Sequence, residues 1–251
     1  MNWSKIKSIM ICFLIAINVF LLAFLSITVF RQTTIPDKVL SASVEVMKKE
    51  GFDCDTQLLP KVYYTLPSIS AQFYSAAALS DLFFKRQLAF RTVENSLVAS
   101  EEKATLTING NFFTYESGYA PDNSVSPNKI KRALKKLGID MSGAVYDEKS
   151  GYFYCMYKNL NLFNMYIQAK LDDSGEICYV SAQWPSKLSP LAKRTFSFNE
   201  SIMNLKKIFP SGGKITAIEP GYSLRSANSS EKYILSPSWR VTVNGELKIL
   251  E

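Results

Sequence analysis

Histidine is absent from this chain of 251 residues. Imidazole is the usual proton carrier of hydrolases and a common zinc ligand. Its absence therefore excludes Ser-His-Asp and Cys-His catalysis, HExxH zinc sites, and autophosphorylation on a histidine of this chain. A large share of extracellular enzyme mechanisms is excluded with them.

Cysteine is scarce, with four residues and no CxxC pair. This excludes a zinc ribbon and a thioredoxin-like redox site. Cys12 lies in an apolar run, and Cys54, Cys155 and Cys178 form an odd set that cannot pair completely. A Cys155–Cys178 disulfide and buried free thiols both remain open. We expect no metal and no cofactor.

Charge is absent from Ser8 to Phe30. As a helix rising about 1.5 Å per residue, this run reaches roughly 35 Å, enough to cross a hydrocarbon core of about 30 Å. A cleaved signal peptide has a shorter apolar region and a small residue at its cleavage position, where Ser26-Ile27-Thr28 offers a threonine. We therefore predict an uncleaved transmembrane anchor at residues 8–30.

The orientation follows from the first seven residues, in which Lys5 and Lys7 have no acidic neighbour and Trp3 suits the membrane interface. Positive residues stay on the cytoplasmic side. We expect a single-pass protein of the cell membrane, in contact with the lipid bilayer, with residues 1–7 cytoplasmic and residues 31–251 extracellular.

The predicted anchor carries two candidate contact faces. Small residues let helix backbones approach closely in lipid, where such packing drives association. One face is a stripe at helical spacing: Ser8, Cys12, Ala16, Val19, Ala23 and Ser26. Asn18 lies on the opposite side, where its amide favours an interhelical hydrogen bond. The alternative is that a single-pass anchor tolerates these residues without a partner.

The extracellular part has the pattern of an α+β fold. Helical spacing and end signals predict helices at residues 36–51, 78–90, 126–138 and 198–210, the last capped by Asn199. Strands rich in Tyr, Phe, Val and Thr are predicted at 61–66, 69–76, 91–99, 103–108, 111–117, 143–148, 151–159, 162–171, 176–184, 213–224, 231–243 and 246–251. Turn residues between them indicate antiparallel hairpins.

The order of helix, meander and helix recurs in the two halves of this region. A linker rich in Pro, Gly, Asn and Ser lies between them. We therefore predict two related modules, residues 31–120 and 121–251, each a helix plus an antiparallel sheet.

Basic residues exceed acidic ones, 29 to 22, and the mild excess is too diffuse for a nucleic-acid reader. A cluster lies on one side of the helix predicted at 126–138: Lys129, Lys131, Arg132, Lys135 and Lys136. Such a helix can contact an anionic surface, although the same pattern is typical of a solvated helix face.

Paired carboxylates are the remaining route to catalysis, since a glycoside hydrolase needs two. Asp53 with Asp55 follows a helix end, and Asp172 with Asp173 and Glu176 fills a hairpin turn. Aspartate is favoured at both places for local backbone hydrogen bonds. We expect no enzymatic activity and no catalytic residue.

Three segments resemble a known family. The opening Met1–Ile9 (MNWSKIKSI) runs into Phe13–Leu22 (FLIAINVFLL), and Ser236–Val241 (SPSWRV) precedes Asn244-Gly245 near the end. Together with the single anchor and α+β exterior, they are similar to the YycI branch of the YycH/YycI family.

The resemblance implies a non-enzymatic accessory of the WalKR (also YycFG) two-component system of low-GC Gram-positive bacteria. It would act with a YycH-like protein by contacting the membrane helices of the sensor histidine kinase, with wall-hydrolase expression as the output. Only the anchor carries over by residue: Trp3, Lys5 and Lys7 for topology and Asn18 for helix contact. Asn2 replaces the family's more usual Asp.

A second function remains open. Residues 31–251 would bind an anionic wall polymer or lipid, and the anchor would be a passive tether.

Overall fold

The computed structural model describes residues 3–122, 125–225 and 233–250, without the side chains of residues 3–6, 8–9, 27, 29–32 and 194. It is a mixed α+β structure with a large sheet, which confirms the predicted class.

Five α-helices and one 3-10 helix form in the described ranges. They are α1 Trp3–Thr33, α2 Asp37–Lys49, η1 Thr56–Leu58, α3 Ala76–Phe84, α4 Pro127–Leu137 and α5 Phe198–Ile208. The helices predicted outside the anchor are confirmed, although α3 ends early, at the left-handed Lys85. None of the helices, over the residues described, is long and apolar enough to cross a membrane.

The strands fall where the hairpin pattern predicts, with some differences. They are β1 Phe52–Asp53, β2 Tyr64–Phe73, β3 Arg91–Val93, β4 Ser96–Glu101, β5 Ala104–Asn109, β6 Phe112–Glu116, β7 Ala144–Asp147, β8 Tyr152–Tyr157, β9 Leu160–Leu171, β10 Ile177–Gln183, β11 Pro185–Phe196, β12 Gly213–Arg225, β13 Tyr233–Val243 and β14 Glu246–Leu250. Most neighbours are antiparallel, but β12 pairs in parallel with β1 and with β9.

Hydrogen bonding joins the main strands in the order β11-β2-β13-β12-β9-β10-β6-β5-β4-β3. Within this order β11 is terminal, and the sequence did not predict it. The strand contains Pro185 and Pro190, which lack the backbone N–H that an inner strand needs. Proline is tolerated on an edge strand. Because its two prolines argue against a strand, the sequence of residues 185–196 did not predict β11.

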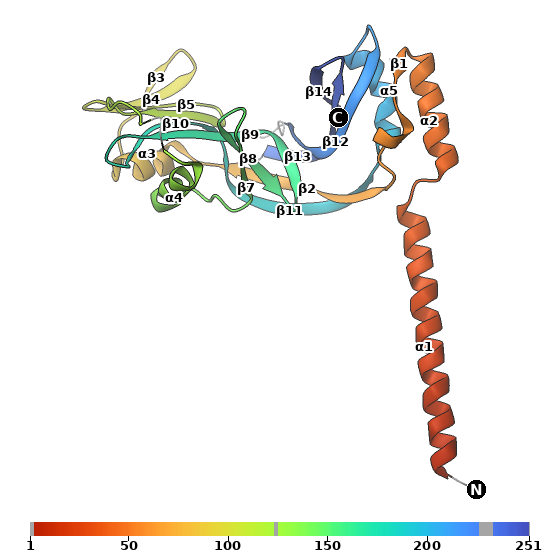
Figure 1. Cartoon of the computed structure of the whole chain (residues 1–251). Coiled ribbons are helices and arrows are strands. Elements are labelled where there is room, and N and C mark those ends of the chain that lie inside the picture. The colour runs from red at the N-terminus through yellow and green to blue at the C-terminus, as the bar shows by residue number, and fades with distance from the viewer. Residues whose placement is uncertain (1–2, 123–124, 226–232, 251) are drawn as a thin grey trace. The chain divides into compact units, whose positions relative to one another are not determined.

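Contacts divide the chain into two compact units (Figure 1). The first unit comprises Met1–Leu66, Arg194–Ile218 and Val241–Leu250, and the second comprises Pro67–Lys193 and Glu219–Arg240. The chain passes from one unit to the other within β2, β11, β12 and β13. The predicted modules, 31–120 and 121–251, divide the chain differently, because their boundary lies inside the second unit's longest segment.

The core of the first unit lies between α2, α5 and short strand pairings. Met47 of α2 and Leu205 of α5 are fully buried. The Ser43 hydroxyl donates to Asn199 Oδ1 at 3.0 Å, joining the two helices. Asn199 therefore lies inside α5 as a contact to α2, and Ser197 occupies the N-cap position predicted for it.

In the second unit, α3 and α4 cover the same face of the sheet (Figure 1). The Phe83 ring of α3 stacks on Tyr115 of β6 with centroids 4.3 Å apart. Gly138 ends α4 at φ +106, and a Cβ there would meet Leu82 Cδ2 at 2.9 Å. The left-handed backbone at this position favours glycine, and a Cβ there would force the Leu82 side chain of α3 to shift.

Candidate functional site

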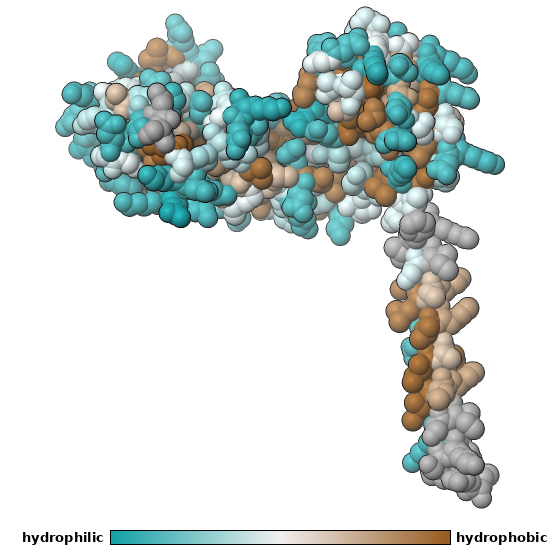
Figure 2. Space-filling view, in the orientation of Figure 1, coloured by the Kyte–Doolittle hydropathy of each residue, from teal (hydrophilic) through white to brown (hydrophobic). Residues whose placement is uncertain are grey.

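Helix α1 exposes large apolar side chains along its described length (Figure 2). Phe13, Phe20 and Leu22 are each more than 60% exposed. Such a surface is costly in water, where each exposed apolar side chain forgoes about 1.5–3 kcal/mol of burial free energy. Exposed apolar patches of this kind indicate a surface that is covered by lipid or protein.

The polar side chains of α1 bond to their own helix. The Asn18 amide Nδ2 donates to the Leu14 carbonyl oxygen at 2.9 Å, and Ser26 Oγ donates to Leu22 O at 2.8 Å. Back-bonding of this kind lowers the cost of a hydroxyl or amide in an apolar medium. Asn18 keeps one N–H and its Oδ1 for a partner, since its amide offers two donors and one acceptor oxygen.

The stripe predicted on α1 is exposed wherever its side chains are described. Those residues are Cys12, Ala16, Val19, Ala23 and Ser26. The side chains of Trp3, Lys5 and Ser8 lie outside the described set. Lys7 is exposed and takes part in an interaction. The small residues and Asn18 therefore all lie on open helix surface.

The end of α1 is bonded to the body of the first unit. The Tyr63 N–H donates to Thr33 O, and the Ile35 N–H donates to Lys61 O, both at 2.8 Å. Ile35 is only 2% exposed, and Pro36 then caps α2. Only residues 34–36 separate the two helices, so α1 joins the rest of the first unit without a loose linker.

Helix α4 presents a basic face to solvent. Its apolar side is anchored by Leu134, which is fully buried. The exposed cations are Lys129, Arg132, Lys135 and Lys136, and none forms an ion pair within the described chain. Lys131 differs, because its Nζ donates to the Ala144 carbonyl at 2.9 Å and so holds the start of β7.

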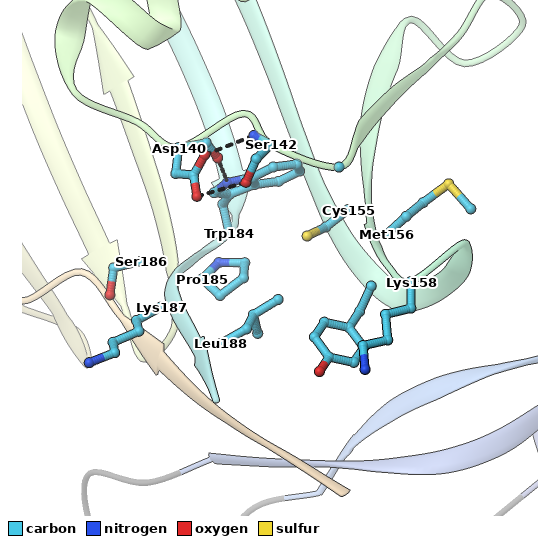
Figure 3. Close-up of a pocket in the computed structure, with 12 residues that line it drawn as sticks. Asp140, Ser142, Cys155, Met156, Lys158, Trp184, Pro185, Ser186, Lys187 and Leu188 are labelled. Carbon is cyan, nitrogen blue, oxygen red and sulfur yellow. Dashed lines mark hydrogen bonds between the residues drawn. The ribbon is translucent and has the colours of Figure 1, made fainter. Parts of the chain in front are cut away.

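A pocket of about 480 Å³ lies in the second unit (Figure 3). Its residues come from the segment after α4, from the end of β8 with the turn after it, and from the start of β11 with the residue before it. They are Asp140, Ser142, Gly143, Cys155, Met156, Tyr157, Lys158, Trp184, Pro185, Ser186, Lys187 and Leu188. Trp184 Nε1 donates to Asp140 O at 2.9 Å, and Asp140 accepts from the Ser142 N–H and hydroxyl. These bonds make one end of the pocket rigid.

The groups in this pocket do not form a nucleophile and base. Burial raises the pKa of the Cys155 thiol to about 12, so the thiol stays protonated near neutral pH. The Asp140 carboxylate is used by the Ser142 turn. Sequence reasoning missed the pocket because its residues come from three separate segments with no shared motif.

The acidic clusters have structural roles. Asp172 Oδ1 accepts from the N–H groups of Ser174 and Glu176, and the Ser174 hydroxyl bond lowers the pKa of this carboxyl. Asp55 Oδ1 accepts from the Gln57 N–H and caps η1. Over the placed residues, no group of three acidic or sulfur ligands is arranged for a metal ion.

The cysteines are free. Cys54, Cys155 and Cys178 are buried thiols, and Cys12 is exposed on α1. Of the two arrangements left open by the sequence, the structure has the free thiols.

Comparison with known proteins gives distant likenesses to solved structures. No protein family model and no curated protein matches the chain. Among solved structures it is similar to an uncharacterized protein from Eubacterium rectale, with a TM-score of 0.42, 11% identity, and coverage of 79% of this chain and 85% of that one. It is also similar to the Bacillus megaterium YpeB C-terminal domain, with a TM-score of 0.31, 11% identity, and coverage of 72% and 99%.

Proposed function

We propose that this chain is a non-enzymatic, membrane-anchored regulator of a cell-wall two-component sensor kinase. In this proposal α1 spans the cell membrane once, with its N-terminus cytoplasmic. It contacts the membrane helices of the kinase and of a YycH-like accessory, as the YycI resemblance of residues 1–22 implies. The exposed apolar surface of α1 and its uncharged run support the spanning role.

The junction after α1 is the observation that carries the proposal. A passive tether needs no fixed connection, whereas a helix that transmits a change must be attached firmly to the part that senses it. The Thr33 and Ile35 backbone bonds, with Ile35 buried, make such an attachment. A ligand bound by the body of the chain, or strain on it, can shift the kinase between its two activity states only under one condition. The contacts between α1 and the kinase must differ in free energy between those two states.

The test is a flexible insertion at the junction. Eight residues of Gly-Ser placed between Gln32 and Thr33 separate the rest of α1 from the Thr33 bond to Tyr63 and the Ile35 bond to Lys61. The uncharged run of residues 8–30 stays intact. We expect the variant to reach the membrane and co-purify with the kinase but to lose its effect on kinase output.

The control is the same insertion in the β4–β5 turn, between the exposed Glu102 and Lys103. This variant should regulate normally. Two results would reject the proposal and leave α1 as a passive tether. One is normal regulation by the variant with the junction insertion, and the other is normal regulation when a foreign membrane span replaces α1.

A second candidate is binding of an anionic wall polymer or lipid. The observation in its favour is the basic face of α4, whose four exposed cations have no acidic partner in the described part of the chain. Exposed charges without partners attract polyanions, and the attraction falls as salt screens it.

Sedimentation of the full chain with isolated cell walls tests this candidate. Replacing Lys129, Arg132 and Lys135 with Gln should abolish binding to native walls. The same change at Lys38, Lys48 and Lys49, which are exposed on α2, gives an equal charge loss and should leave binding intact. Equal binding to walls stripped of their anionic polymers would exclude the candidate.

A further inference from the structure

A second pocket, of about 320 Å³, lies beside the basic face of α4 in the second unit. It is lined by the C-terminal turns of α3 and α4, by β6 and by the β9–β10 turn, through Phe83, Lys85, Tyr115, Ala133, Lys136, Leu137, Gly175, Glu176 and Ile177. Its volume is at the lower end of the range of about 300–1,000 Å³ that is usual for ligand pockets.

The floor of this pocket is apolar and held in place. Phe83 and Tyr115 stack with an interplanar angle of 15°, and Tyr115 is 9% exposed. Burial, and after it the nearby charges of Cys178 and Glu176, raise the pKa of the Tyr115 hydroxyl, so it stays neutral. Leu137 and Ile177 complete a surface that suits a short hydrocarbon chain.

The rim carries charge from two helix ends. Lys85 Nζ donates one hydrogen to the Leu82 carbonyl at 3.0 Å, which fixes the ammonium and leaves two donors. Lys136 is exposed at the end of α4, and Glu176 lies on the β10 side. Two ammonium groups and one carboxylate give the rim one net positive charge.

This combination selects a ligand with an anionic head and an apolar tail. A phosphodiester carries one negative charge and matches the net charge of the rim. The Glu176 carboxylate accepts hydrogen bonds, so it suits hydroxyl groups on the same head. A choline head would place its cation against two lysines and has no hydroxyl to donate.

We propose that this pocket binds a single acidic phospholipid with a hydroxylated head, its phosphate at Lys85 and Lys136 and part of its acyl chain over Phe83, Tyr115, Leu137 and Ile177. The inference rests on the second candidate function and narrows it to one ligand class and one site. It is independent of whether α1 contacts a kinase.

The probe is radiolabelled dihexanoyl phosphatidylglycerol, used below its micelle concentration in equilibrium dialysis against the full chain in phosphatidylcholine nanodiscs. Empty nanodiscs give the partition blank. Dihexanoyl phosphatidylcholine tests the need for charge, and glycerol phosphate tests the need for the tail. We expect saturable binding of the first probe, at least tenfold tighter than either of the others.

The decisive comparison uses double variants of equal charge. Lys85→Gln with Lys136→Gln should weaken binding at least fivefold, whereas Lys48→Gln with Lys49→Gln on α2 should bind as the original chain does. Ala133→Leu, which fills the pocket, should weaken binding of the tailed probe, with an unchanged melting temperature showing that it folds. Glu176→Gln keeps an acceptor oxygen for the hydroxyl groups of the head and removes the charge that repels the phosphate, so it should tighten binding.

Equal binding of the two phospholipids, or full binding by the Lys85 and Lys136 double variant, would overturn the inference. Wall sedimentation that depends on Lys129, Arg132 and Lys135 is a separate result. If it persists while the pocket variants bind normally, the second candidate function stands and the pocket assignment alone fails.

Discussion

The side-chain amide of Asn18 donates a hydrogen bond of 2.9 Å to the carbonyl oxygen of Leu14, one turn earlier in α1. This bond satisfies one of the two amide N–H groups within the helix. The bond lowers the cost of placing the amide in an apolar medium and leaves one N–H and Oδ1 available for a further hydrogen bond.

Under the proposed function, replacing Asn18 with Leu should weaken association of the chain with the sensor kinase in the membrane. Interhelical hydrogen bonds in lipid are worth about 0.6–2 kcal/mol, so the apparent affinity should fall roughly threefold to thirtyfold. Co-purification from membranes at graded expression levels measures this. Ile17→Leu, at the neighbouring position, is the matched control, and equal association by both variants would mean that Asn18 makes no contact.

Replacing Gly221 with Ala should destabilise the second unit. A Cβ at this position of β12 would meet Phe163 Cζ at 2.3 Å and the Asn161 backbone oxygen at 2.6 Å. Because β9 backbone cannot retreat easily, we expect a loss of about 1–3 kcal/mol in the free energy of unfolding. Chemical denaturation followed by tryptophan fluorescence measures it.

Gly118→Ala supplies the comparison for that substitution. Its Cβ would meet Lys103 Cβ at 2.9 Å, but both residues are exposed and lie outside the strands, where the backbone can shift at little cost. The Gly118 backbone has no positive φ. This variant should unfold at the denaturant concentration of the original chain. A similar loss in both variants would show that the packing around Gly221 is not specific.

Replacing Lys131 with Gln should cost stability, whereas Lys129→Gln should not. Lys131 Nζ bonds to Ala144 O at 2.9 Å and is half-buried, while Lys129 is exposed. Loss of this charged hydrogen bond should lower the free energy of unfolding by about 1 kcal/mol. Matched denaturation curves of the two variants test the assignment of Lys131 to the fold.

Alkali should destabilise the folded chain progressively between about pH 9 and pH 12. Burial raises the pKa of Cys155 from 9.0 to about 12 and that of Tyr222 from 10.0 to about 12. The unfolded chain loses these protons first, so stability is complete below pH 9 and falls as the pH rises towards 12.

Cys155→Ala isolates the thiol contribution to this alkaline loss. The variant should be less stable at every pH because it leaves a cavity, but its stability should fall less steeply between pH 9 and 10. Denaturant midpoints measured at half-unit pH steps give the slope. An unchanged slope would show that the thiol does not couple to unfolding.

Local signals in the sequence were sufficient for most of the elements. Pro127 and Gly138 mark the ends of α4, and the structure places both there. The run predicted as one strand at 91–99 is instead a hairpin, because Glu94 and Asn95 adopt positive φ and close a tight turn between β3 and β4. Glutamate is not a residue typical of turns with positive φ, so the composition of this segment did not predict the turn.

The candidate sites depended on distant contacts and were harder to predict. Lys131 has the same charge and helix spacing as its neighbours, so only the position of Ala144 separates it from them. The bonds that hold α1 join residues 33–35 to 61–63, and the pocket beside α4 joins two helix ends to a hairpin turn. Tertiary packing determines all three features, and the periodicity of the sequence carries no information about which distant segments pack together.

Residues 241–250 belong to the same compact unit as residues 1–66. Val241–Leu250 lies in the same unit as the segment that leaves α1, and Leu250 is completely buried there. A stop codon, a tag or a protease acting a few residues before Leu250 would therefore damage the unit to which α1 belongs. No single cut of the gene yields either unit whole, so dissecting this protein requires circular permutation or excision of internal segments.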